Sequence, residues 1–151
     1  MDNVEFKNII NDLLSFYGFK RKGNCWRHRT NELEKVIYLQ KSNFSNLYYI
    51  NYGYNINNLI DPNVTMHVFN RLHANNPNDQ KKVAITLDLE SDLNTTKRKE
   101  NLIYILKEFL LEEIININTE DDLKMNLLCR SHLNDISLSV KNYFKFDSNK
   151  N

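Results

Sequence analysis

The hydrophobic positions of this chain change their period near residue 18. From residue 3 to residue 17 the apolar side chains follow the spacing of a helix with one buried stripe: Phe6, Ile9, Ile10, Leu13, Leu14 and Tyr17. Gly18 comes next, at the position where a left-handed residue often ends a helix. From Asn24 to Glu90 the pattern becomes strand-like. We therefore predict an N-terminal helix followed by a sheet.

The strand-like region predicts five strands, which are separated by turn residues such as Asn31-Glu32 and Asp61-Pro62. The predicted strands cover residues 25–30, 33–41, 47–54, 64–72 and 83–90. The fifth strand has the clearest alternation, which places four apolar side chains toward a core: Val83, Ile85, Leu87 and Leu89.

Helical spacing returns after Thr95 and continues from Leu102 to Ile114. Thr119, with Asp122 three residues later, is a plausible N-cap for a further helix. Residues 136–144 fit a last helix, although Ile136, Leu138 and Val140 also alternate as in a strand. We predict a helix for this segment.

This order of elements predicts an α+β fold. A run of strands with short connections favours an antiparallel meander of about five strands, and the N-terminal helix and two to three C-terminal helices are expected on one face. The second face would be partly open. We find no repeats or linkers, so residues 1–151 are expected to form a single domain.

Composition leaves several classes of protein open. The net charge is +1, which neither requires nor excludes a nucleic-acid partner. The charge is uneven, because residues 20–29 are basic and residues 112–122 are acidic. No secretion signal and no apolar run of ~18 residues are visible, so we expect a cytoplasmic protein that does not enter a membrane. Its cysteines, Cys25 and Cys129, are expected to be reduced.

The basic segment is the first candidate for a binding surface. Arg27 and Arg29 share one face of their predicted strand, while Trp26 and His28 share the other. With Lys20 and Lys22 beside them, the two arginines could contact an acidic protein or the phosphates of a nucleic acid. The alternative is a solvated edge strand whose charge prevents edge-to-edge pairing. For the predicted partner-binding surface we choose Lys20, Lys22, Trp26, Arg27 and Arg29.

A second candidate consists of polar residues within otherwise apolar and aromatic strands: Gln40, Lys41, Ser42, Asn51 and Arg71. A polar side chain in such a strand needs a hydrogen-bond partner. Gln40 and Asn51 could bond each other across the sheet, which is a structural role, or form a polar floor for a partner. We include Gln40, Lys41, Asn51 and Arg71 in the predicted partner-binding surface.

Candidates for chemistry are weaker. On a predicted strand, Asp88 and Glu90 would share one face and could hold a divalent ion, but a solvent-exposed edge explains them fully and is the better interpretation. Cys129 and His132 could reach one metal ion from a helix, although a cysteine there is more often a small core residue. No glycine-rich phosphate loop is present. We predict no metal, no cofactor and no enzymatic activity.

Several segments together resemble the uncharacterised bacterial family called domain of unknown function 4304. They are residues 18–22, residues 37–42, residues 49–54 and residues 67–72, in this order, and the likeness covers roughly residues 6–115. Where that family tends to have tryptophans before the fifth strand, this chain has residues Asp79 to Lys82. The resemblance implies a binding role of the immunity-protein type.

We therefore predict a non-enzymatic protein that binds and blocks a toxin domain. Either the basic strand or the acidic residues 112–122 would supply the charge complementarity. The first alternative is a nucleic-acid-binding module that uses the basic region. The second is a metal-dependent hydrolase that uses Asp88 and Glu90.

Overall fold

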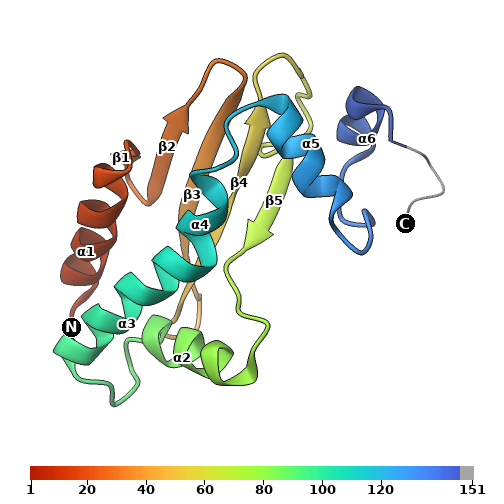
Figure 1. Ribbon diagram of the computed structural model, residues 1–151. Helices are drawn as coiled ribbons and strands as arrows, with labels where there is room; N and C mark the ends of the chain where they lie inside the picture. The colour runs from red at the N-terminus through yellow and green to blue at the C-terminus, as the bar shows by residue number, and fades with distance from the viewer. Residues whose placement is uncertain (147–151) are drawn as a thin grey trace.

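The computed structural model describes residues 1–146, in which one helix is followed by five strands and then by further helices (Figure 1). The strands are β1 (Lys20–Lys22), β2 (Cys25–Arg29), β3 (Leu33–Lys41), β4 (Tyr48–Ile56) and β5 (Val68–Arg71). The helices are α1 (Asn3–Phe16), α2 (Pro77–Leu87), α3 (Thr95–Leu106), the π-helix η1 (Lys107–Leu111), α4 (Glu112–Ile114), α5 (Glu120–Leu128) and α6 (Leu138–Phe144).

The five strands form one antiparallel sheet in the order β1-β2-β3-β4-β5, so each strand pairs with its neighbour in the sequence. This confirms the predicted α+β fold with a five-stranded meander. The helices α1, α3 and α4 lie against the same face of the sheet, which is the face toward the viewer in Figure 1.

The contacts between helices and strands involve alternate strand residues, as the period of a strand requires. Trp26 Nε1 of β2 donates to Asn11 of α1 at 3.1 Å. Lys35 Nζ of β3 donates to the carbonyl oxygen of Ile114 at 2.8 Å. Around these contacts the buried apolar residues form one core cluster that extends from Phe6 to Phe144.

The predicted fifth strand is wrong, because residues 77–87 form helix α2. Asn76 caps this helix, since its side chain accepts the backbone N–H groups of Asn78 and Asp79, and Pro77 occupies the first turn. Val83 and Leu87 are four residues apart, which suits a buried helix stripe as well as one face of a strand. The alternating pattern was therefore ambiguous, and the capping residues decided it.

The fifth strand of the sheet is instead β1, which hydrophobic alternation could not reveal. All three of its residues are charged and exposed. The strand forms because Lys20, Arg21 and Lys22 pair with residues 25–27 across the turn at Gly23. Gly23 has a φ of 62°, in the left-handed region that favours glycine.

Other expected elements are confirmed with small shifts of their ends. Gly18 ends α1 with a φ of 88°. Thr119 and Asp122 form a reciprocal capping box at the start of α5, and residues 138–144 are helical. The fourth predicted strand is shorter than expected, since β5 covers residues 68–71 only.

No helix within residues 1–146 is long and apolar enough to cross a membrane.

Candidate functional site

The strand register brings most of the predicted partner-binding residues to one face. Residues paired across an antiparallel ladder lie on the same side, as do alternate residues of one strand. Lys20 pairs with Arg27 and Asn51 pairs with Arg71. Seven of the nine predicted residues thus share the face that the helices leave uncovered: Lys20, Lys22, Arg27, Arg29, Gln40, Asn51 and Arg71. We call this surface the open face.

Trp26 and Lys41 do not belong to the open face. Trp26 is fully buried under α1, so its selection as a partner contact is wrong. Trp26 and Arg27 are neighbours in β2 and point to opposite faces of the sheet, so the register that exposes the arginine buries the tryptophan. Lys41 pairs with Tyr48 on the helix side and is exposed at the end of β3. Trp26 was selected for its place within the basic segment, and Lys41 for its place beside Gln40, and neither criterion gives the face of the sheet.

The open face carries an excess of positive charge. Five cationic side chains of the strands lie on it with a single carboxylate, Glu34. Glu34 pairs with Arg27 at 2.7 Å, and Arg29, which stands opposite Glu34 in the register, has no ion pair within residues 1–146. Lys20 stands directly opposite Arg27, and like charges in this position reduce the stability of a sheet. The stability of the sheet therefore does not explain why these positive charges gather on the open face.

A hydrogen-bonded group of Gln40, Asn51 and Arg71 lies in the middle of the open face. Asn51 Nδ2 donates to Gln40 Oε1 at 3.0 Å, which confirms the cross-strand bond expected from the sequence. Arg71 donates from Nε to Asn51 Oδ1 and from Nη2 to Gln40 Oε1, both at 3.0 Å. Its guanidinium also lies 4.5 Å from the centre of the Tyr49 ring. These contacts hold Arg71 in one orientation. Asn51 itself is fully buried, so its selection as a partner contact is wrong and its role is structural.

An open hollow of about 490 Å³ lies beside this group on the open face. It is lined by Cys25, Arg27, Val36, Tyr38, Thr65, Met66 and Phe69. Phe69 is 48% exposed, so an apolar ring is available next to the cations. Aromatic side chains beside arginines are the residue types that dominate binding energy in protein interfaces.

The metal candidates of the sequence do not assemble. Because α2 replaces the expected strand, Asp88 follows a helix and its carboxylate accepts the N–H of Glu90. Glu90 in turn accepts the N–H of Asn46. Helix α5 ends at Leu128, so Cys129 and His132 do not share a helix face. Within residues 1–146 no three His, Cys, Asp or Glu side chains are grouped to hold a metal ion.

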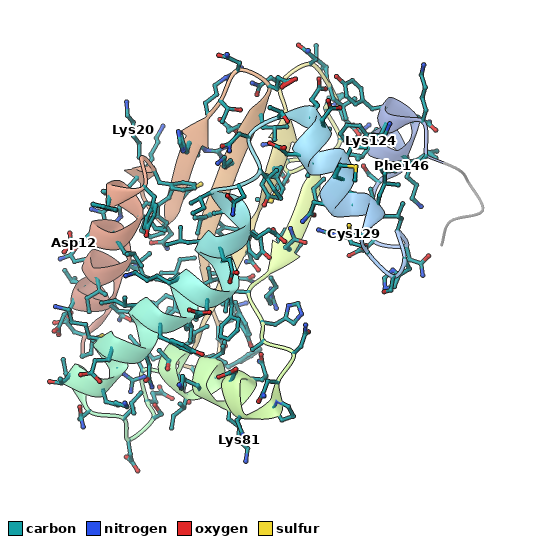
Figure 2. The ribbon with its side chains drawn as sticks, viewed as in Figure 1. Asp12, Lys20, Lys81, Lys124, Cys129 and Phe146 are labelled. Carbon is teal, nitrogen blue, oxygen red and sulfur yellow. The ribbon has the colours of Figure 1, made fainter. Side chains whose placement is uncertain are left out.

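A second site, which the sequence did not indicate, is a cleft between the edge strand β5 and the segment that follows α5. Its volume is about 670 Å³, and polar side chains dominate its lining: Tyr52, Asn70, Arg71, Glu113, Arg130 and His132. We call it the edge cleft. Cys129 lies at the end of α5 beside this region (Figure 2).

The buried end of the edge cleft contains Glu113 between two tyrosines. The Tyr54 hydroxyl donates to Glu113 at 2.9 Å. Burial and then the charge of Glu113 raise the pKa of Tyr52 and of Tyr54 well above the ordinary value. Both phenols therefore stay neutral.

A π-helical turn positions one of the residues of this cleft. The helical segment from Thr95 to Ile114 contains a π-helical turn at Lys107–Leu111, directly before the two glutamates 112 and 113. An extra residue in a helix shifts the side chains that follow, and such turns are frequent at functional sites. The helix can thus bury Ile114 while Glu113 reaches Tyr54.

The chain was also compared with known proteins. A family model described as Domain of unknown function (DUF4304) matches residues 10–113. The chain belongs to this family. No curated protein and no solved structure matches it. The matched segment includes the five strands, and hence the open face, whereas Arg130 and His132 of the edge cleft lie beyond it.

Proposed function

We propose that this protein acts by stoichiometric binding, without a chemical reaction, and that its open face docks an acidic surface of a protein partner. The observation that carries the proposal is the gathering of five cations and one carboxylate on a sheet face that no helix covers. Unbalanced charge of this kind attracts an oppositely charged partner and accelerates association.

The acidic segment at residues 112–122 is less suited to docking, because several of its carboxylates already have partners inside the protein. Glu113 accepts the Tyr54 hydroxyl, Glu120 accepts the Tyr143 hydroxyl, and Asp122 caps α5. Backbone N–H groups of Asn118 and Thr119 lower the pKa of Asp122. The open face is therefore the stronger choice for charge complementarity.

The partner class that we propose is a toxin domain, which the protein would neutralise by covering its active site. Support comes from the family resemblance and from a rigid, preformed open face, which favours tight one-to-one binding. The proposed place of action is the cytoplasm, in accord with the free thiols of Cys25 and Cys129. Co-expression with the product of the adjacent gene tests this partner class: the expected result is a stable complex and protected cells, and the absence of both contradicts it.

Charge reversal tests the docking surface itself. Lys20→Glu with Lys22→Glu should weaken binding of the protein partner by at least roughly tenfold, mainly through slower association that salt no longer affects. The fold should persist, since Lys20→Glu replaces a like-charged pair with Arg27 by an opposite one and Lys22 stands opposite the uncharged Cys25. Surface plasmon resonance at two salt concentrations measures both effects.

The matched control reverses two exposed lysines of the helices, Lys81→Glu and Lys99→Glu, which changes the net charge equally. Lys20 and Lys81 lie at opposite ends of the molecule (Figure 2). The control variant should bind nearly as the unmodified protein does. Equal losses in both variants would mean that net charge, and not the open face, governs binding.

The second candidate function is nucleic-acid binding by the same face, which the ring of Phe69 beside Arg27 favours. One observation weakens it: the ring of Tyr49 is already stacked with Arg71 and is not free for a base. Fluorescence anisotropy with single-stranded RNA and DNA separates the two functions. Binding that falls steeply with salt would support this candidate, and a flat titration at low salt excludes it.

A further inference from the structure

Arg130 in the edge cleft has more hydrogen-bond donors than the described residues use. Its Nη2 donates to Asn70 Oδ1 at 2.7 Å, and its Nη1 lies 3.9 Å from Asp135 Oδ2, which is beyond hydrogen-bond distance. The side chain is only 21% exposed. A guanidinium carries five N–H donors in a fixed fork. A largely covered arginine with spare donors facing a cavity is a receptor for a planar or tetrahedral anion.

The groups next to Arg130 extend this donor set. The amide nitrogen Nδ2 of Asn70 is buried and has no hydrogen-bond partner within residues 1–146, although the amide oxygen is held by Arg130. His132 Nδ1 accepts the N–H of Asn134 at 3.3 Å, so the neutral ring carries its proton on Nε2. A buried donor without a partner costs about 1–3 kcal/mol unless a ligand or water satisfies it.

The edge cleft also contains two carboxylates, Glu113 and Asp135, which match Arg71 and Arg130 in number, so an oxyanion there would be held by hydrogen-bond donors and not by net charge. Glu113 is occupied inside the protein, since it accepts the Tyr54 hydroxyl at 2.9 Å and Asn126 Nδ2 at 3.3 Å. Asp135 is 59% exposed, and its pair with Arg130 is long and screened by solvent. Arg71 and His73 also line the cleft and supply further nitrogen atoms.

We propose that the edge cleft is a binding site for a small ligand that bears an oxyanion, a carboxylate or a phosphate, held in a bidentate manner by Arg130. The ring of His132 would bond the same group, the buried Asn70 Nδ2 would reach it by a small rotation of its amide, and Tyr52 would form the floor beneath the rest of the ligand. A volume of about 670 Å³ is within the range of small-molecule sites. This site is separate from protein docking on the open face, apart from Phe69 and Arg71, which border both.

The test is a titration followed by NMR of the nitrogen-labelled full chain, with inorganic phosphate and succinate as separate probes and sodium chloride at equal ionic strength as the reference. We expect saturable shifts of the Arg130 Nε–H and Asn70 amide signals with one or both oxyanions but not with chloride. The two probes distinguish binding of a phosphate from binding of a carboxylate. An absence of saturable shifts with both probes would overturn the proposal.

Variants make the assignment specific. Arg130→Gln should lower affinity for the active probe by roughly tenfold or more, since it removes charged hydrogen bonds. Arg130→Lys, which keeps the charge but not the fork, should bind at intermediate strength, and His132→Gln should weaken binding without touching the core. Arg29→Gln on the open face is the matched control and should bind normally. Unchanged affinity in Arg130→Gln and His132→Gln contradicts the site, whatever the outcome for the protein partner.

Discussion

Two buried cations, Arg98 and Lys35, stabilise helix ends in this protein at the scale of single residues. The last carbonyl groups of a helix lack partners and form the negative end of its dipole. Arg98 is 2% exposed and donates to the carbonyl oxygens of Ile85, Thr86 and Asp88 at the end of α2. Lys35 bonds Ile114 in the same way, and burial lowers its pKa. These hydrogen bonds to helix carbonyl groups explain why two charged side chains lie within an apolar core.

Arg98→Met should therefore destabilise the fold strongly. Arg98 also donates to the carbonyl oxygens of Ser91 and Leu93, so the substitution leaves a series of buried acceptors unsatisfied. We expect the free energy of unfolding to fall by roughly 3 kcal/mol or more. Urea denaturation measures it. The neighbouring Lys99→Met, at an exposed position, should change stability by no more than about 0.5 kcal/mol. Similar effects in the two variants would refute the role of Arg98.

At the scale of elements, the packing of β5 on β4 depends on the missing side chain of Gly53. A Cβ atom at this position would lie 1.8 Å from the carbonyl oxygen of Val68 and 2.4 Å from the sulfur of Met66. With any other residue at position 53, the backbone of β5 and the loop before it could not approach β4 this closely. This approach shapes the hollow on the open face, which Met66 and Phe69 line.

Gly53→Ala should cost roughly 1–3 kcal/mol of stability and displace β5, because a backbone oxygen cannot move away alone. Denaturation together with amide chemical shifts of residues 68–71 measures both changes. Gly23→Ala is a useful comparison, since no atom lies within 4 Å of a Cβ there and only its positive φ is strained. If Met66→Ala restores the stability of the Gly53 variant, the clash with Val68 is not the cause.

At the scale of the whole molecule, the tyrosines of β4 couple stability to alkaline pH. The raised pKa values of Tyr52 and Tyr54 mean that the unfolded chain loses these protons first, near pH 10. Stability is thus complete below that pH and falls as pH rises above it. These two protons contribute a slope of about 2.7 kcal/mol per pH unit, to which other groups with shifted pKa values, such as Tyr48 and Lys35, add their own contributions.

Urea denaturation at several pH values between about 9 and 12 measures this slope, with tyrosinate absorbance as a second signal. Tyr54→Phe should reduce the slope by about 1.4 kcal/mol per pH unit, because one proton is removed. Tyr17→Phe in the α1 C-cap serves as the control, since its phenol has no bond to Glu113. A slope that Tyr54→Phe leaves unchanged would contradict the coupling.

The sequence by itself determined the local structure wherever one pattern had one interpretation. The helix stripe ending at Gly18 predicted α1, the alternation in residues 33–41 and 48–54 predicted β3 and β4, and Thr119 predicted the start of α5. Alternation also identified Gln40 and Asn51 as polar residues that need each other. Such features depend on periodicity and capping, which act over a few residues.

Only the tertiary structure decided the features that join distant segments. Val83 to Leu89 alternate as in a strand, yet most of this segment is helical, while β1 had no apolar residue to reveal it. The register alone placed Lys20 and Arg71 on one face and buried Trp26. The edge cleft joins Tyr52, Glu113 and Arg130 from elements far apart in the chain. Contacts of this kind depend on how strands and helices pack, and no local period encodes that packing.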